Sequence, residues 1–233
     1  YATGAFRSAF RYEGDVLETG YPRNDVLCSE PAPGLLDQVR QRIQLPEGKK
    51  VVLYAPTFRD DSKGRRGFSF ELPFDLERLV QELGDDVVLL LRMHVLIADR
   101  VAVPDHLRRH VIDVSRYPEI QELYLVSDVL VTDYSSVFFD YALLRRPMIF
   151  HAYDLESYRD HLRGFYLDYE AEVPGPVTTT DDELCAALRQ ALADDAGPWP
   201  GIEEFVARFA PHDDGHAAAR VVDAALGGTL TAD

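Results

Sequence analysis

The stretch that most constrains the fold runs from Ser127 to Phe150 and reads SDVLVTDYSSVFFDYALLRRPMIF. It begins with the short β-branched run Val129–Val131 and passes through hydroxyl and carboxylate side chains. Apolar residues then recur at near-helical spacing until Arg145, and Pro147 ends the pattern. The stretch therefore predicts a strand, a tight turn and a helix, followed directly by a second strand that ends at Phe150.

Apolar runs and helical patterns alternate along much of the remaining chain. A strand that is covered on both faces of a parallel sheet has a continuous apolar sequence, and Val51–Ala55, Val87–Leu91 and Val111–Val114 have this form. Helical spacing is found near residues 35–43, 76–83, 120–126 and 184–192. This alternation is typical of parallel strands joined by right-handed crossovers. We therefore predict an α/β chain, with a Rossmann-like parallel sheet and helices on both faces.

Shorter features complete the expected secondary structure. Val16–Leu17 is expected to form a short strand, and Val177 to begin a last edge strand. Thr180 and Glu183 have the spacing of a capping box, which predicts the start of a helix at that point.

The composition limits the classes of function. With 233 residues, 46% of them hydrophobic, the chain can bury a substantial core. Its 24 lysines and arginines face 40 aspartates and glutamates, and the formal charge of −16 disfavours a nucleic acid or an anionic membrane as partner. The longest apolar runs are far shorter than the roughly 20 residues that span a bilayer. We expect a cytoplasmic chain that does not insert into the membrane.

The two cysteines indicate neither a metal site nor a disulfide framework. Cys28 and Cys185 have no CxxC motif and no histidine at ligand spacing. They are expected to be small core or surface residues in a reducing compartment. We predict no metal and no cofactor.

Side chains suited to binding or catalysis follow several of the expected strands. In an open parallel sheet, ligands bind beyond the carboxyl ends of the strands, where the strand order reverses. The residues at those ends are Thr57, Arg59, His94, Asp133, Ser135, Ser136, Tyr153 and Asp154. The first N–H groups of a helix lack backbone partners, so a serine at the start of the helix is suited to help bind a phosphate. The alternative is that Ser135 only caps its own helix, and the turn alone leaves both interpretations open.

Each of the other candidates also has a purely structural interpretation. A single histidine after a strand, such as His94, is more often a hydrogen-bonded structural group than a catalyst. Arg59 has carboxylates next to it, and Asp140 could be a solvated carboxylate on its helix. Arg163 could simply brace an irregular loop. Taken one at a time, these residues do not decide the function.

Several motifs together resemble those of one family. They are VLYAPTFRD at 52–60, TDYSSV at 132–137, RRP at 145–147, the segment from YR at 158–159 through RGFY at 163–166, and PGP at 174–176, flanked by YPRND at 21–25 and DDG at 213–215. In order and spacing they resemble the CDP-glycerol glycerophosphotransferases of teichoic acid synthesis. The resemblance extends over nearly the whole chain.

The resemblance implies a GT-B architecture, in which two Rossmann-like halves face each other across a cleft. This chain would be mostly the C-terminal, donor-binding half. Residues 1–27 would form the end of the N-terminal half and the interdomain segment, and residues 28–210 the donor-binding domain. Residues 211–233 would form a C-terminal helix that packs back toward the N-terminal side. In the family the other half bears a second histidine and much of the acceptor site, so we expect this portion alone to be inactive.

The resemblance also implies a catalytic role for one histidine. His94 matches the histidine that follows the second strand of this half in the family, although Val95 stands where proline is usual. The expected role of His94 is to stabilise charge on the diphosphate, or on the departing phosphate, as the bond breaks.

Further site residues are implied in the same way. Those expected to bind the donor diphosphate are Ser135, Ser136, Thr57, Arg59 and Arg163. Asp140 and Asp133 are expected on the nucleoside side, with Asp140 near the ribose hydroxyls and Asp133 as an orienting group.

The reaction that the resemblance implies is a phosphoryl transfer. An acceptor glycerol hydroxyl would attack the β-phosphorus of CDP-glycerol, or of CDP-ribitol in related members, and CMP would leave. Positioning and charge stabilisation supply most of the rate acceleration in such transfers. The acceptor would be a lipid-linked polyol phosphate bound through the N-terminal half, and the full-length protein would work at the inner face of the cell membrane.

Two other functions stay open from the sequence. A GT-B glycosyltransferase that uses a nucleotide-sugar would be expected to have a glycine-rich turn at Ser135-Ser136 and a glutamate at Asp140. A non-catalytic GT-B-like interaction domain would have no need of His94 or of the two serines.

Overall fold

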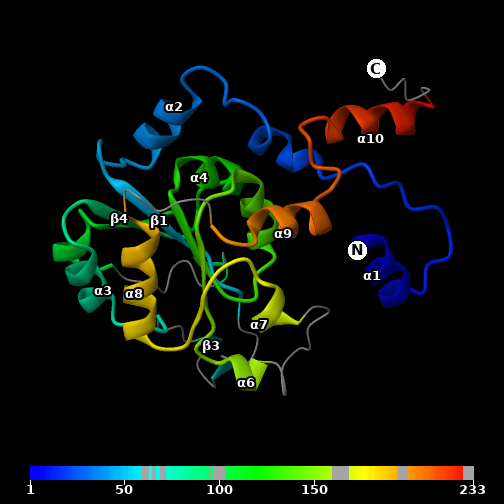
Figure 1. Cartoon of the computed structure of the whole chain (residues 1–233). Helices are drawn as coiled ribbons and strands as arrows, with labels where there is room; N and C mark the ends of the chain where they lie inside the picture. Colours follow the sequence, from blue (N-terminus) through cyan, green and yellow to red (C-terminus); the bar gives the residue numbers. More distant parts are fainter. Residues whose placement is uncertain are drawn as a thin grey trace.

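A computed structural model describes residues 1–58, 63–64, 67–68, 72–94, 96, 103–158, 168–193 and 199–227. Its centre is a six-stranded parallel sheet (Figure 1). The strands are β1 (Lys50–Tyr54), β4 (Val87–Leu91), β5 (Val111–Asp113), β6 (Val129–Thr132), β7 (Met148–His151) and β8 (Val177–Thr178).

The strands are ordered β5-β4-β1-β6-β7-β8 across the sheet, and every neighbouring pair is parallel. Counted along the chain, this is the order 3-2-1-4-5-6 of the Rossmann fold. The predicted Rossmann-like parallel sheet is therefore confirmed. The predicted edge strand at Val177 is β8, and it pairs with β7.

Both faces of the sheet are covered, which is why its strands are continuously apolar. Successive side chains of a strand point to opposite faces, and two separate clusters of buried residues result. Leu53 belongs to the cluster under α2 (Leu35–Arg42), α4 (Ile120–Val126), α5 (Val137–Tyr141) and α9 (Ile202–Phe209). Val52 belongs to the cluster under α3 (Leu76–Leu83) and α8 (Asp181–Ala191), which lie side by side in Figure 1. The prediction of helices on both faces is confirmed.

Local sequence signals set the ends of these helices. The Asp75 side chain accepts a hydrogen bond from the Arg78 N–H (3.1 Å) and so caps α3, which ends at Gly84. The predicted capping box at the start of α8 is present. The Thr180 side chain accepts from the Glu183 N–H (3.3 Å), and the Glu183 carboxylate accepts from the Thr180 N–H (3.2 Å).

Segments from the two ends of the sequence pack together beside the sheet. Helix α1 (Ala2–Phe10) and the 3-10 helix η1 (Pro22–Leu27) precede the sheet, and α10 (Ala217–Leu226) packs against η1. The prediction of a strand at Val16–Leu17 is wrong, because these residues have no strand conformation and pair with no other strand in the described part of the chain. Leu17 is 67% exposed. The predicted domain boundaries at residues 27 and 210 stay predictions.

Shorter elements connect the main ones. They are the antiparallel pair β2 (Lys63–Gly64) and β3 (Gly67–Phe68), the 3-10 helices η3 (Asp105–Leu107) and η4 (Ala142–Leu144), and the short helices α6 (Leu155–Ser157) and α7 (Tyr169–Glu172). No helix in the described ranges combines the length and the hydropathy needed to cross a bilayer.

Candidate functional site

The strand order places a crevice between the carboxyl ends of β1 and β6. From β1 the chain crosses over to β4 on one side, whereas from β6 it continues to β7 on the other side. Ligands of open α/β sheets bind at such a reversal. The segment after β1 includes Thr57, and the turn after β6 begins with Asp133, so two of the predicted site segments are neighbours here.

Asp133 joins these two segments. Its side chain is 1% exposed, and its Oδ1 atom accepts hydrogen bonds from the backbone N–H of Thr57 (2.7 Å) and of Ser135 (3.3 Å). Its carbonyl oxygen accepts from the Tyr169 hydroxyl (2.9 Å). A hydrogen bond from the Thr132 hydroxyl to the Ala55 carbonyl oxygen (2.7 Å) also links the ends of β6 and β1. The carboxylate thus fixes the relative positions of Thr57 and Ser135, and its predicted contact with the nucleoside stays a prediction.

The two serines lie at the start of α5. Ser136 occupies the N-cap position, but its side chain makes no capping hydrogen bond within the described residues. Ser135 is half-buried and Ser136 is exposed. The Ser136 side chain is therefore not used to cap α5, and the interpretation of Ser135 as a cap stays a prediction.

His94 lies near the same crevice, after β4. It is exposed, and its ring stands 4.7 Å from the Phe58 ring, centroid to centroid. Phe58 follows Thr57 directly, so His94 and the β1 end are neighbours. The Nδ1 atom of His94 accepts a hydrogen bond from the Leu96 N–H (3.3 Å). A neutral ring that accepts at Nδ1 carries its hydrogen on Nε2, from which it can donate to an oxygen atom.

Aromatic side chains form one wall beside the serines. Tyr134 stacks on Tyr158, with 3.9 Å between ring centroids, and its hydroxyl donates to Asp154 (3.0 Å). Tyr169 also packs against Tyr134. A cavity of about 550 Å³ opens beside Asp154, at the carboxyl ends of β7 and β8. The sequence placed Asp154 at a strand end but did not predict the stacking of Tyr134 on Tyr158, although the tyrosines between residues 153 and 169 were its signal.

Asp140 points away from open solvent, toward η1. It is 7% exposed, and Arg23 donates to both of its oxygens, from Nε to Oδ2 (3.1 Å) and from Nη2 to Oδ1 (3.0 Å). Asn24 donates a third bond to Oδ1 (2.8 Å). Hydrogen bonding to Asp140 raises the pKa of Arg23 above its ordinary value. The predicted ribose contact of Asp140 stays a prediction, because the carboxylate already has protein partners.

Other predictions fall outside this geometry. Arg59 and Arg163 lie outside the described residues. Arg23 and Asn24 were not predicted as site residues, although the YPRND motif contains them. Among the described residues, no group of three or more histidines, cysteines and carboxylates is placed to hold a metal ion.

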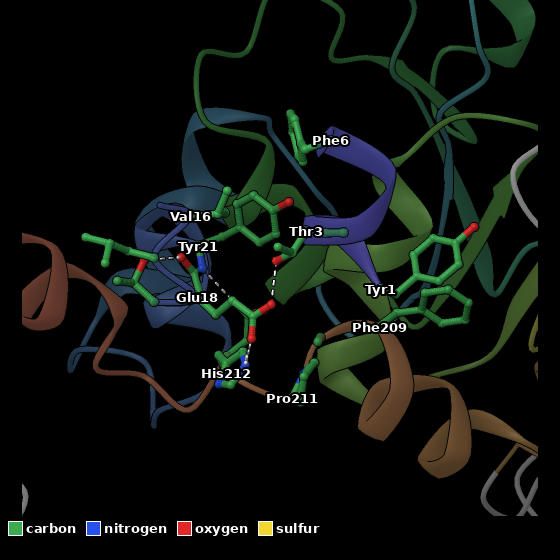
Figure 2. Close-up of a pocket in the computed structure, with 15 residues that line it drawn as sticks. Tyr1, Thr3, Phe6, Val16, Glu18, Tyr21, Phe209, Pro211 and His212 are labelled. Carbon is green, nitrogen blue, oxygen red and sulfur yellow. Dashed lines mark hydrogen bonds and ion pairs between the residues drawn. The ribbon is translucent and has the colours of Figure 1, made fainter. Parts of the chain in front are cut away.

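A second cavity lies apart from the strand ends. Its volume is about 240 Å³, and Figure 2 shows it between α1, the segment before η1 and the end of α9. Glu18 lines it, accepting a hydrogen bond from the Thr3 hydroxyl and lying 3.3 Å from His212 Nε2. None of the predicted site residues lines this cavity.

The comparison with known families decides which family these features belong to. The model of the CDP-glycerol:poly(glycerophosphate) glycerophosphotransferase family matches residues 1–227. The chain belongs to this family. The resemblance that the motifs indicated is confirmed.

Relatives from this family cover the chain almost completely. A teichoic acid glycerol-phosphate transferase of Staphylococcus aureus is 45% identical over 225 residues, which are 95% of this chain and 57% of the relative. A teichoic acid poly(ribitol-phosphate) polymerase of Bacillus spizizenii is 37% identical over 211 residues, which are 90% of this chain and 33% of the relative. The chain thus spans between about a third and just over half of the length of these relatives.

A solved structure supports the same assignment for the glycerophosphotransferase fold. The wall teichoic acid polymerase TagF, a histidine variant soaked with CDPG, is 44% identical and superimposes with a TM-score of 0.88. The match covers 97% of this chain and 56% of that chain. The predicted fold, a Rossmann-like half of the GT-B type, is confirmed.

Proposed function

We propose that the protein containing this chain transfers glycerol phosphate from CDP-glycerol to an acceptor hydroxyl, with release of CMP, and that this chain supplies the donor site. The observation that carries the proposal is the convergence of Thr57, Ser135 and His94 at the strand-order reversal of a glycerophosphotransferase-family sheet. Further support comes from the TagF structure, since the polymerase that was soaked with CDPG is 44% identical to this chain.

Glycerol is the preferred polyol of this proposal. The relative named for glycerol phosphate is 45% identical to this chain, whereas the relative named for poly(ribitol-phosphate) is 37% identical. Both matches cover at least 90% of the chain, so the difference in identity favours a CDP-glycerol donor over CDP-ribitol.

The proposed donor site holds the diphosphate at the turn after β6. Ser135 and Ser136 provide hydroxyl groups, and Thr57 lies opposite them because Asp133 holds the two segments together. Arg59 and Arg163 belong to the proposal as additional cations for the diphosphate. The sequence-based ribose role of Asp140 and Asp133 is kept as an alternative.

In the proposed reaction the acceptor hydroxyl oxygen forms a bond to the β-phosphorus of CDP-glycerol. The bond from that phosphorus to the bridging oxygen breaks, and CMP leaves with the bridging oxygen. Negative charge develops on the phosphate oxygens, and the Nε2–H group of His94 is suited to stabilise it by donating a hydrogen bond. The hydroxyl proton is lost to a base in the part of the enzyme that binds the acceptor.

The acceptor in this proposal is a lipid-linked polyol phosphate. It would be bound by the remainder of the polypeptide, at the inner face of the cell membrane. A nucleotide-sugar transferase is less well supported, because the chain has Ser135-Ser136 in place of a glycine-rich turn and belongs to the glycerophosphotransferase family.

Binding and turnover of the intact protein test the proposal. We expect calorimetry to show binding of CDP-glycerol and CMP in preference to UDP-sugars. The His94→Ala variant should lower the rate of transfer by about 10²-fold or more, since removal of one transition-state donor has an effect of that order. His106→Ala is the matched control, because His106 is also exposed and pairs with Glu77 at the surface. Preference for UDP-sugars, or unchanged transfer in both His94→Ala and Ser135→Ala, would overturn the proposal.

A further inference from the structure

Helix α5 has the donor serines at one end and a partly buried ionic contact at the other. Ser136 precedes the helix, and Asp140 lies one helical turn further along it. Asp140 is 7% exposed and accepts hydrogen bonds from Arg23 and Asn24, which come from η1. More than one hundred residues of sequence separate these partners, so the contact is a tertiary link between η1 and α5.

The geometry of this link is restrictive. The Arg23 guanidinium donates from two nitrogens to the two carboxylate oxygens, which fixes the relative orientation of the two planar groups. Asn24 is 2% exposed and donates to the same carboxylate. Arg23 is also held from the other side, with its guanidinium carbon 4.6 Å from the centre of the Tyr21 ring. The rotation of α5 about its axis is thereby fixed relative to η1.

The turn that precedes α5 is fixed at its other end. Asp133 accepts hydrogen bonds from the N–H groups of Thr57 and Ser135. Ser135 and Ser136 therefore lie between two anchors, Asp133 before them and Asp140 after them. Loss of the second anchor would remove one restraint on α5, and a shift of the helix would move the two serines with it.

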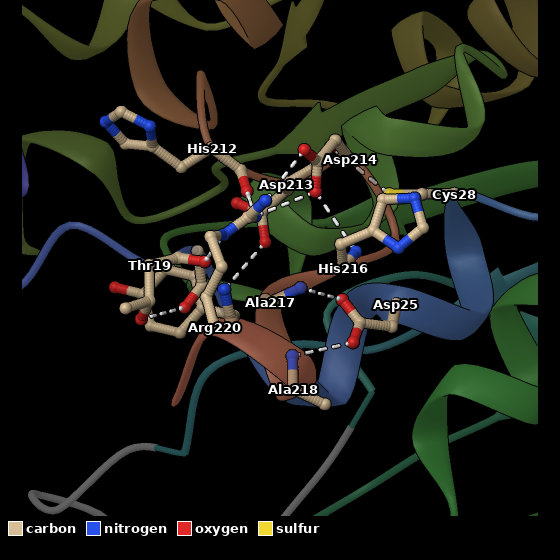
Figure 3. A network of polar contacts seen from close by, with 12 residues as sticks. Thr19, Asp25, Cys28, His212, Asp213, Asp214, His216, Ala217, Ala218 and Arg220 are labelled. Atoms are coloured by element: carbon tan, nitrogen blue, oxygen red, sulfur yellow. Dashed lines mark hydrogen bonds and ion pairs between the residues drawn. The ribbon is translucent and has the colours of Figure 1, made fainter. Parts of the chain in front are cut away.

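Helix η1 is itself held in place from outside the site. Figure 3 shows Asp25 accepting hydrogen bonds from the N–H groups of Ala217 (2.9 Å) and Ala218 (2.8 Å), at the start of α10. The N–H of Tyr21, just before η1, donates to Asp213 (2.8 Å). η1 is thus a fixed element against which α5 can be positioned.

We propose that Arg23 and Asn24 are positioning residues of the donor site. Through Asp140 they fix α5, and the helix in turn places Ser135 and Ser136 against the donor diphosphate. This inference rests on the proposed function. It gives Asp140 a role inside the protein, in place of a contact with ribose.

The test measures donor affinity of the intact protein by calorimetry. We expect Arg23→Gln and Asp140→Asn each to weaken CDP-glycerol binding by about 10-fold or more, since displacement of a positioned group by about 1 Å can have effects up to 10²-fold. The double variant should bind CDP-glycerol no more weakly than either single variant, because all three variants break the same link. Arg189→Gln is the matched control. The Arg189 side chain is 55% exposed, close to the 52% of Arg23, and it also pairs with a carboxylate, that of Glu82.

A 2′-deoxy analogue of CDP-glycerol separates positioning from a ribose contact. If Asp140 acts by positioning, the Asp140→Asn substitution should weaken the binding of CDP-glycerol and of the analogue by the same factor. If the variant loses affinity for CDP-glycerol only, the ribose contact is correct and the inference is overturned. Arg23→Lys, which keeps the charge without the two-nitrogen contact, should show an intermediate affinity and serves where Arg23→Gln does not fold.

The remaining outcomes distinguish this inference from the proposed function. If the wild-type protein binds CDP-glycerol and both Arg23 variants bind it equally tightly, the positioning role is overturned and the proposed function stands. If the wild-type protein does not bind CDP-glycerol, the proposed function is overturned and the positioning role with it.

Discussion

Single buried polar residues hold the strand ends of this sheet in register. Asp133 does so beside β6, and His151 lies at the end of the neighbouring strand β7. The His151 ring is 1% exposed, and its Nδ1 atom lies 3.1 Å from the Thr178 hydroxyl on β8. Burial lowers the pKa of His151 below its ordinary value of 6.5. A buried neutral imidazole is therefore part of the edge of the sheet next to the site.

His151 should make the stability of the protein depend on pH. Below about pH 6.5 the unfolded state takes up a proton at this residue, while the folded state resists it because its pKa is lower. The free energy of unfolding should therefore fall as the pH drops below 6.5. Replacement by glutamine in His151→Gln should flatten this slope, as measured by urea unfolding at a series of pH values between neutral and mildly acidic. His106→Gln, at an exposed histidine, is the control. A slope as steep in His151→Gln as in the wild type would contradict the assignment.

At the scale of secondary-structure elements, α10 depends on a cap from a distant part of the chain. Its N-cap residue is His216, whose side chain makes no capping bond within the described part of the protein. Asp25 of η1 instead accepts from the first two N–H groups of the helix. A carboxylate at a helix N-terminus also interacts favourably with the helix dipole. Helix α10 and η1 are thus joined by an interaction that neither segment provides alone.

Loss of this cap should destabilise the packing of α10. The Asp25→Ala variant leaves two N–H groups without their acceptor, and we expect the free energy of unfolding to fall by about 1–2 kcal/mol. Chemical denaturation would measure the change. Asp223→Ala is the control, since Asp223 is an exposed carboxylate of the same helix. Equal effects of the two substitutions would show that Asp25 has no special role as a cap.

The strands were predictable from sequence because each central strand is apolar on both faces. Val87–Leu91 and Val129–Val131 could be recognised without any knowledge of their neighbours. The strand expected at Val16–Leu17 was wrong because two apolar residues do not form a strand without a partner to pair with.

The sequence allowed some residues of the candidate site to be located, but not the contacts that hold Asp140. Thr57, His94 and Ser135 could be located because the carboxyl ends of parallel strands meet at one edge. The bonds from Arg23 and Asn24 to Asp140 could not, because the sequence displays the YPRND motif but not the partner more than one hundred residues away. Asp140 was accordingly assigned to the ligand, whereas the structure gives it partners within the protein.

At the scale of the whole molecule, one sheet joins two separate apolar clusters. Leu53 is fully buried in the cluster on one face of the sheet. Trp199, the only tryptophan of the 233-residue chain, is 8% exposed and belongs to the cluster on the other face. Val52 and Leu53 are adjacent in β1 and contribute to opposite clusters. Because the strands are common to both, we expect the two clusters to unfold together.

A core substitution on one face tests this cooperativity. Leu53→Ala should lower the free energy of unfolding by about 2–5 kcal/mol, the range for a truncated buried leucine. If the sheet unfolds as one unit, tryptophan fluorescence from the opposite face should report the same shifted denaturation midpoint as far-UV circular dichroism. Leu226→Ala, at a leucine that is 81% exposed, should leave both midpoints unchanged. A Trp199 transition that stays at the wild-type midpoint while the dichroism transition shifts would mean that the two faces unfold independently.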